Sequence, residues 1–165
     1  MNKQKGFSLI ELLIVVAIIL IIAAIAVPNL LRSRMAANEA SAAGSMRTLA
    51  TSNVTFSTTY NQGFADALTA LGPGAGGGAT SAQADLIDST LAGGIKSGYT
   101  FSYVSDPAGG SAPSSPNNSY TATATPGTAN TTGVSWFCVD PSNVVRKDPA
   151  AAATENNPGV DCNAD

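Results

Sequence analysis

The chain has 165 residues, of which 12% are charged, and its formal net charge at pH 7 is −3. It contains no histidine, so the commonest general base and metal ligand is missing, and with it every Ser-His or Cys-His nucleophile arrangement. Sequence-independent binding of nucleic acid needs clustered Lys and Arg, whereas 11 acidic side chains here outnumber 8 basic ones. We therefore expect no enzyme, no direct nucleic-acid binding, no cofactor and no metal ion.

A single carboxylate interrupts the apolar N-terminal segment. Glu11 is followed by sixteen apolar residues, from Leu12 to Val27. An ionisable residue in a membrane span costs roughly 2.5–3.5 kcal/mol at the helix centre and less near an end, and it marks a functional position. Glu11 is therefore expected to pair with a cation.

The segment 7–31 is long enough to cross a bilayer. Its 25 residues would extend about 37 Å as a helix, which allows some tilt. Lys3 and Lys5 precede it and favour a cytoplasmic N-terminus by the positive-inside rule. Arg32 and Arg34 flank the other end, so the charge bias alone is weak.

The N-terminal residues resemble the prepilin signature of type IV pilins and type II secretion pseudopilins. The similarity covers a basic leader, the glycine before a cut, the phenylalanine after it, the glutamate and the apolar run, in Lys5-Gly6-Phe7-Ser8-Leu9-Ile10-Glu11-Leu12-Leu13-Ile14-Val15. The resemblance implies that residues 1–6 are a leader, which a prepilin peptidase removes between Gly6 and Phe7 before it methylates the Phe7 amine. It also implies that Glu11 pairs with the Phe7 amine of a neighbouring subunit as a filament grows.

The physical chemistry of the cleaved chain agrees with that expectation. Cleavage would leave a free ammonium on Phe7, beside an apolar run that also contains Glu11. Each charge is costly in lipid, and their offset along the helix favours a staggered neighbour that satisfies both. The pairing would therefore select the register of the subunits.

The N-terminus has two other interpretations. An ordinary secretory signal could end at Ala24-Ile25-Ala26, which has the small-x-small form of a cleavage site. A plain signal anchor is the second alternative. The apolar core is longer than a usual signal core and carries Glu11 near its start, which favours the prepilin interpretation.

Residues 7–60 are expected to form one long helix of 54 residues, roughly 80 Å if continuous. Pro28 is its only proline and predicts a kink or a locally melted stretch at the membrane exit. Family members commonly have a proline there. The outer half of the helix carries an apolar stripe at spacings of 3 and 4, formed by Ala42, Met46, Leu49, Asn53, Phe56 and Tyr60.

Three aromatic residues follow one another along this stripe. Phe56, Tyr60 and Phe64 are spaced at i, i+4 and i+8, provided that the helix continues as far as residue 64. Electron transfer has been proposed for some aromatic-rich pilins. An apolar stripe normally packs against the rest of its domain, so we expect these rings to anchor the helix to a sheet.

Residues 61–165 are expected to form a small β-rich head. This part holds 14 of the 16 glycines and 8 of the 9 prolines. Alternating residues predict strands at 98–104, 120–125 and 135–139, and a hairpin to 144–146 through Asp140-Pro141-Ser142-Asn143. Residues 72–85 and 105–119 are expected to be exposed loops. Three or four strands packed on a long helix would be an α+β architecture that resembles the pilin fold.

Cys138 and Cys162 are the only cysteines, and both lie in the part expected to face the outside. Two cysteines in an oxidising compartment most simply form one disulfide, with a pair of free thiols as the alternative. Many type IV pilins have such a C-terminal disulfide loop.

Acidic residues in the last part of the chain raise the question of calcium. They are Asp140, Asp148, Glu155, Asp161 and Asp165, with Asn163 between the last two. Major pseudopilins bind calcium near this end, but the distal bidentate glutamate and the turn glycine of a calcium loop are missing here. A solvated acidic loop is the favoured interpretation.

The sequence thus predicts a major type IV pilin that polymerises through its N-terminal helix. Implied partners are further copies of the chain, the peptidase, an inner-membrane platform protein and an assembly ATPase. The subunit would cross the inner membrane once before assembly and lie in an extracellular pilus afterwards, used for attachment, surface motility or DNA uptake. The alternatives are a type II secretion pseudopilin, a minor pilin, or a membrane-anchored monomer whose head binds an extracellular ligand.

Overall fold

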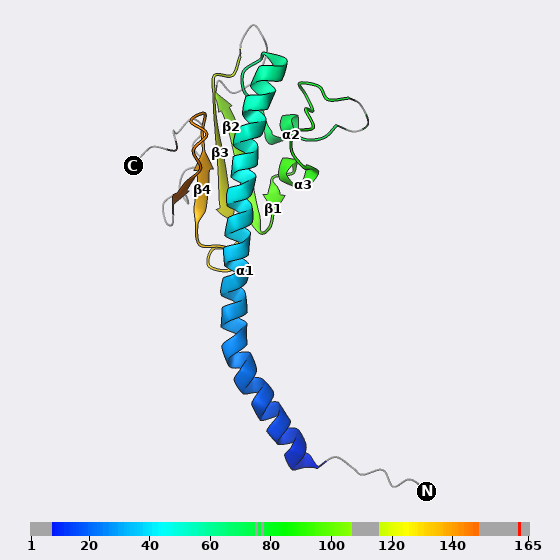
Figure 1. Ribbon diagram of the computed structural model, residues 1–165, viewed down its shortest axis with the longest axis vertical. Coiled ribbons are helices and arrows are strands. Elements are labelled where there is room, and N and C mark those ends of the chain that lie inside the picture. Colours follow the sequence, from blue (N-terminus) through cyan, green and yellow to red (C-terminus); the bar gives the residue numbers. More distant parts are fainter. Residues whose placement is uncertain (1–7, 75, 77, 107–115, 149–161, 163–165) are drawn as a thin grey trace. The chain divides into compact units, whose positions relative to one another are not determined.

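A long helix and a small antiparallel sheet make an α+β structure (Figure 1). The computed structural model describes residues 8–74, 76, 78–106, 116–148 and 162. The chain divides into two compact units, Met1–Arg34 and Met35–Asp165. Helix α1 runs from Leu9 to Tyr60, close to the predicted span, and contributes to both units.

Helix α1 ends before the third aromatic residue of its stripe. Tyr60 is the last helical residue, and Asn61 turns the chain with a positive φ of 52°. Gly63 follows with a φ of 77°, and a Cβ there would lie 2.2 Å from the carbonyl oxygen of Asn117. The helix therefore ends at Tyr60, as predicted, and does not continue to Phe64, because the chain needs these left-handed residues to turn back toward the sheet.

The sheet has five strands in the order β1-β2-β3-β4-β5, and each strand is antiparallel to its neighbours. Four of them match expected strands within a few residues, and β1 was not foreseen. The strands are β1 (Ile95–Lys96), β2 (Tyr99–Asp106), β3 (Ser119–Pro126), β4 (Trp136–Val139) and β5 (Arg146–Asp148).

The missed strand β1 depends on a tight turn. Lys96 pairs with Tyr99, so Ser97 and Gly98 alone make the loop, with φ values of 51° and 74°. Two successive positive φ values are typical of a type I′ hairpin turn, whose twist suits the flanking strands. The Ser-Gly pair was a local signal for this turn.

The core lies between one face of the sheet and the outer half of α1. Alternate strand residues are buried, as the period-2 pattern predicts, among them Tyr99, Phe101, Tyr120, Ala122, Ala124, Phe137 and Val139. The helix contributes Ala42, Met46, Leu49, Asn53 and Phe56, each at most 1% exposed. The predicted stripe is thus confirmed as the packing face of the helix in the head.

Two short helices precede the sheet. They are α2 (Leu68–Leu71) and α3 (Ser89–Ala92), and neither was predicted. The described residues of 72–85 are mostly exposed, but Ala84 is buried because its N–H donates to the Ala70 carbonyl at 2.8 Å. Residues 107–115 of the second expected loop lie outside the described residues, and β2 and β3 extend into its two ends.

Candidate assembly helix and its anchorage to the head

The first half of α1 presents apolar side chains to its surroundings along its length. Large apolar residues from Leu9 to Leu31 are at least 44% exposed within the structure. The helix is long and apolar enough to cross a membrane. An exposed apolar surface of this length is unfavourable in water, so we expect lipid or other helices to cover it.

Glu11 lies in the first turn of this apolar helix. Its side chain is exposed, and its backbone N–H donates to the Ser8 carbonyl at 3.1 Å. A carboxylate at a helix N-terminus is favoured by the macrodipole. Phe7 and Gly6, the other two residues expected at the assembly end, lie outside the described residues.

The helix continues through Pro28 without the melted stretch that the sequence allowed. A proline removes only one backbone donor, which is the N–H that any other residue at position 28 would donate to the Ala24 carbonyl. The Asn29 side-chain amide donates to the Ile25 carbonyl at 3.1 Å, and the Ser33 hydroxyl donates to the Asn29 carbonyl at 3.0 Å. These side chains add helical hydrogen bonds where the proline takes one away.

A buried polar cluster ties the outer half of α1 to the sheet. The Tyr103 hydroxyl on β2 donates to Asn53 Oδ1 at 2.7 Å and lies 3.0 Å from the Ala65 carbonyl oxygen. The Ala65 N–H donates to the same Asn53 oxygen, and the Asn53 amide donates to the Leu49 carbonyl. Burial, with the nearby Tyr120, raises the pKa of Tyr103 well above its usual value, so the hydroxyl stays a donor.

Tyr103→Phe should lower the free energy of unfolding by about 1.5 kcal/mol, because it leaves Asn53 and the Ala65 carbonyl short of a donor. Thermal unfolding of the detergent-solubilised full chain measures this change. Tyr60→Phe is the matched control, since the Tyr60 hydroxyl makes no hydrogen bond to the described residues. Equal effects of the two substitutions would contradict a role for the cluster.

A second polar cluster holds the loop before β4 against α1. The Glu39 carboxylate accepts hydrogen bonds from the backbone N–H groups of Val134 and Ser135 at 2.9 and 3.1 Å. It also accepts from the Ser135 hydroxyl at 3.0 Å and from the Lys147 ammonium on β5 at 3.2 Å. The neighbouring Asn38 amide donates to the Thr132 carbonyl at 2.9 Å. We call Glu39 with its four donors, on Val134, Ser135 and Lys147, the Glu39 clamp.

The clamp keeps Glu39 charged. Burial alone would raise the pKa of this carboxyl, but the donors of Val134, Ser135 and Lys147 outweigh burial and lower the pKa from its ordinary value. Nearby Tyr99 is fully buried and donates from its hydroxyl to the Ser135 carbonyl at 2.8 Å. Burial and the Glu39 charge raise the pKa of Tyr99 to about 12, so this donor is also retained.

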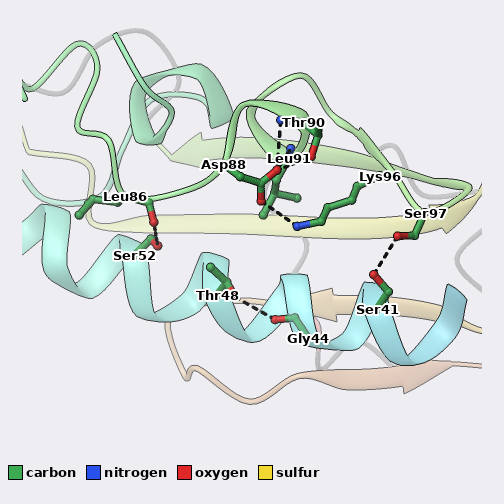
Figure 2. A network of polar contacts seen from close by, with 10 residues as sticks. All are labelled: Ser41, Gly44, Thr48, Ser52, Leu86, Asp88, Thr90, Leu91, Lys96 and Ser97. Carbon is green, nitrogen blue, oxygen red and sulfur yellow. Dashed lines mark hydrogen bonds and ion pairs between the residues drawn. The ribbon is translucent and has the colours of Figure 1, made fainter. Parts of the chain in front are cut away.

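Figure 2 shows a third set of contacts, between α1 and residues 86–97. The Ser52 hydroxyl donates to the Leu86 carbonyl at 3.1 Å, and the hydroxyls of Ser41 and Ser97 lie 2.9 Å apart. Asp88 caps the N-terminus of α3 and pairs with Lys96 at 2.7 Å, as Figure 2 also shows. The hydrogen bond from Lys96, followed by that from Thr90, holds the pKa of Asp88 well below its usual range.

An open hollow of about 440 Å³ lies beside this third set of contacts. Four of the six residues that line it carry a hydroxyl group; the lining residues are Arg47, Thr48, Thr51, Ser52, Thr55 and Leu86. The three threonine hydroxyls already donate to helix carbonyls four residues earlier. The lining offers no general base or nucleophile–base pair that could support chemistry.

Cys138 on β4 forms a disulfide with Cys162, as expected from the sequence, with their Cα atoms 5.8 Å apart. The bond joins residues 24 positions apart and ties the C-terminal part of the chain to the sheet. Of the acidic residues considered for calcium, Asp140 instead organises the turn after β4, where it accepts from the Ser142 N–H at 2.9 Å. Glu155, Asp161 and Asp165 lie outside the described residues. The described residues of the chain contain no group of three or more His, Cys, Asp or Glu side chains that could hold a metal ion.

Replacing both Cys138 and Cys162 by serine should cost roughly 3.5 kcal/mol of stability in the chain-entropy model. Thermal unfolding of the full chain with and without reductant provides the measurement. Reductant should shift the wild-type protein toward the double variant and leave the double variant unchanged. A wild-type chain that unfolds identically in both conditions would contradict this role of the bond.

The sequence predicted the Cys138–Cys162 disulfide correctly but gave no indication of the Glu39 clamp, and the assembly role of Gly6, Phe7, Glu11 and Pro28 stays a prediction. That prediction comes from a continuous local pattern, whereas Glu39 contacts Val134 and Lys147 only in the folded chain. An acidic residue in the outer half of the long helix was only a weak signal that hydrogen-bond donors from distant parts of the chain would surround it.

Comparisons with known proteins agree with the N-terminal pattern. The family model described as "Prokaryotic N-terminal methylation motif" matches residues 1–27. The chain is similar to the type IV wide pilus major component PilA4 of Thermus thermophilus, with 62% identity over 39 residues. This match covers 24% of the present chain and 30% of the relative.

The two matches cover parts of the chain, and the architecture adds independent support. A long apolar N-terminal helix packed in its outer half on a small antiparallel sheet is a pilin-like arrangement. Such proteins are structural subunits and not enzymes. The methylation motif, the similarity to a pilus component and this fold together support a type IV pilin.

Proposed function

We propose that the chain is the major subunit of a type IV pilus. The observation that carries this proposal is a single carboxylate, Glu11, in the first turn of α1, whose first half is apolar and exposed. The apolar surface favours packing against identical helices, and Glu11 selects the register in which they pack. The similarity to a major pilus component over 39 residues supports the major over the minor subunit.

The same proposal defines the path of the subunit. A prepilin peptidase removes residues 1–6 and methylates Phe7, and the segment 7–31 then anchors the subunit in the inner membrane. An inner-membrane platform protein and an assembly ATPase transfer it into an extracellular filament. Residues 61–165 form the outer surface of that filament, which serves attachment, motility or DNA uptake.

The test is the intact mass of the protein in filaments sheared from the cell surface. A chain that starts at Phe7, carries one methyl group and lacks two hydrogens is expected, because processing and the Cys138–Cys162 bond both leave a mass signature. A form starting at Phe7 that remains entirely in the membrane would favour a pseudopilin. A chain starting near Val27 would overturn the filament proposal.

A further inference from the structure

The end of the apolar segment carries two arginines that the filament proposal does not use. Arg32 directly follows Leu31, the last large residue of the exposed apolar run, and Arg34 comes two positions later; both arginine side chains are exposed. About 32 Å of helix separates Glu11 from Arg32, close to the roughly 30 Å thickness of the hydrocarbon core of a bilayer. With Glu11 at one membrane interface, both guanidinium groups therefore reach the headgroups of the other leaflet.

Neither arginine has a counter-ion along the helix. Residues 28–38 contain no Asp or Glu, so no carboxylate stands three or four positions away, where ion pairs form on a helix surface. The ion pairs within the part of the chain that the structure describes are those of Asp88 and Glu39, and both are made with lysines. The two guanidinium groups can therefore bind an anion from outside the described chain.

Other polar side chains at this level are used within the helix. The Asn29 amide donates to the Ile25 carbonyl at 3.1 Å, and the Ser33 hydroxyl donates to the Asn29 carbonyl at 3.0 Å. The arginines are therefore the groups that remain for a partner around the helix. A guanidinium is always charged and binds a phosphate group through two parallel hydrogen bonds. At the end of a membrane span, the phosphate of a lipid headgroup lies at the matching depth.

A neighbouring copy of α1 is a poorer partner for these cations. The proposed pairing of Glu11 with the Phe7 amine staggers neighbouring helices by about one helical turn. Each arginine would then stand beside residues 28–38 of the neighbour, which contain no carboxylate. The next acidic residue is Glu39, and its carboxylate already accepts from its four donors in the Glu39 clamp.

We propose that Arg32 and Arg34 bind the phosphate groups of anionic phospholipids in the outer leaflet of the inner membrane, before the subunit enters the filament. This inference rests on the membrane anchorage proposed above and adds the class of lipid that holds the subunit there. The two side chains are about 200° apart around the helix, so they bind separate lipid molecules. Once Lys3 and Lys5 are removed with the leader, these arginines are the only side-chain cations that flank the span.

The test is lipid retention by the full chain in nanodiscs with equal amounts of dioleoylphosphatidylglycerol and dioleoylphosphatidylcholine. All chains carry Lys3→Gln and Lys5→Gln, so that the leader cannot bind anionic lipid. Native mass spectrometry counts the lipids that stay with the chain when the disc is disrupted. The chain with both arginines should retain the anionic lipid preferentially. Replacing Arg32 and Arg34 by Gln should reduce that preference about fivefold for each arginine, and replacing both by Lys should reduce it less.

Arg47→Gln is the matched control, because Arg47 is an exposed arginine of the same helix outside the unit Met1–Arg34. Near-UV circular dichroism establishes that the head of each variant is folded. Equal retention of the two lipids by the chain with both arginines would overturn the proposal. An undiminished preference after both Gln substitutions, or an equal loss in Arg47→Gln, would also overturn it.

Two further outcomes would assign the arginines to a different anion. Displacement of the lipid by inorganic phosphate, but not by sodium chloride of equal ionic strength, would indicate a site for a free anion. Unchanged lipid retention together with loss of filaments after both Gln substitutions would assign the pair to a neighbouring copy. A chain that does not enter nanodiscs of phosphatidylcholine alone would overturn the membrane anchorage as well, whereas entry without a lipid preference overturns only the present inference.

Discussion

Glu11→Ala should abolish filament assembly while the head remains folded. The substitution removes the anion that would pair with the Phe7 ammonium of the neighbouring subunit, and that ammonium then lies unpaired beside apolar helices. An unpaired charge in such surroundings costs roughly 3 kcal/mol or more, equivalent to about a 100-fold loss in each association step. Because a filament repeats the step at every subunit, the amount of chain in the sheared cell-surface fraction should fall below detection.

The packing and the stability of the head should not change with this substitution. Glu11 belongs to the unit Met1–Arg34, whereas the core residues belong to Met35–Asp165. Near-UV circular dichroism and the thermal midpoint of the detergent-solubilised chain should therefore match wild type. Filaments at wild-type abundance from Glu11→Ala would remove the proposed role of the carboxylate and favour a membrane-anchored monomer or another packing mode.

Two further variants separate charge from shape at this position. Glu11→Asp keeps the carboxylate but shortens its reach, so it should assemble fewer filaments than wild type and more than Glu11→Ala. Ile10→Ala removes an exposed apolar side chain next to Glu11 and should retain assembly. A loss as complete in Ile10→Ala would show that bulk apolar contact, and not the charge pair, controls register.

The parts of the fold that the sequence predicted are those whose cause is local. Tyr99, Phe101 and Tyr103 alternate within β2, and they face the core because the side-chain period of a strand is two. The turn at Asp140 closes through the Asn143 N–H, which donates to the Asp140 carbonyl at 2.9 Å, as Asp-Pro turn chemistry requires.

Of the parts that were missed, β1 has a local cause and the Glu39 clamp has a distant one. β1 contains two residues and exists because the turn at Ser97 and Gly98 sets them against β2. Glu39 meets its donors 95 residues along the chain at Val134 and 108 residues along at Lys147. These contacts form only after α1 has packed on the sheet, so no periodic pattern of residues in the sequence predicts them.

Glu39→Ala should be the most destabilising substitution on the surface of the head. The carboxylate is 19% exposed and accepts from two N–H groups, one hydroxyl and the Lys147 ammonium. Its removal leaves these donors partly buried without an acceptor, which should cost about 4 kcal/mol. For a head of this size the thermal midpoint should fall by roughly 15 °C, measurable by near-UV circular dichroism of the full chain in nonionic detergent.

Asp85→Asn is the matched control for this prediction. Asp85 is an exposed carboxylate whose side chain accepts no hydrogen bond from the described residues. Its φ of 54° also suits asparagine, so the substitution should change stability by less than about 0.5 kcal/mol. A similar loss in both variants would mean that net charge, and not the Glu39 clamp, sets the stability of the head.

The clamp should also make stability depend on pH in a defined direction. The pKa of Glu39 is lower in the folded head than its ordinary value of 4.5, because its donors favour the charged form. The stabilisation is therefore complete above the unfolded pKa and is lost as the pH falls through the folded one. The difference in unfolding free energy between wild type and Glu39→Gln should stay constant from about pH 7 to about pH 5.5 and shrink toward about pH 3. Glu39→Gln cannot titrate at this position, so the difference cancels the other groups, including Asp88, whose pKa is also lowered. If the difference does not change over this whole range, the stabilisation by these donors does not depend on the charge of Glu39.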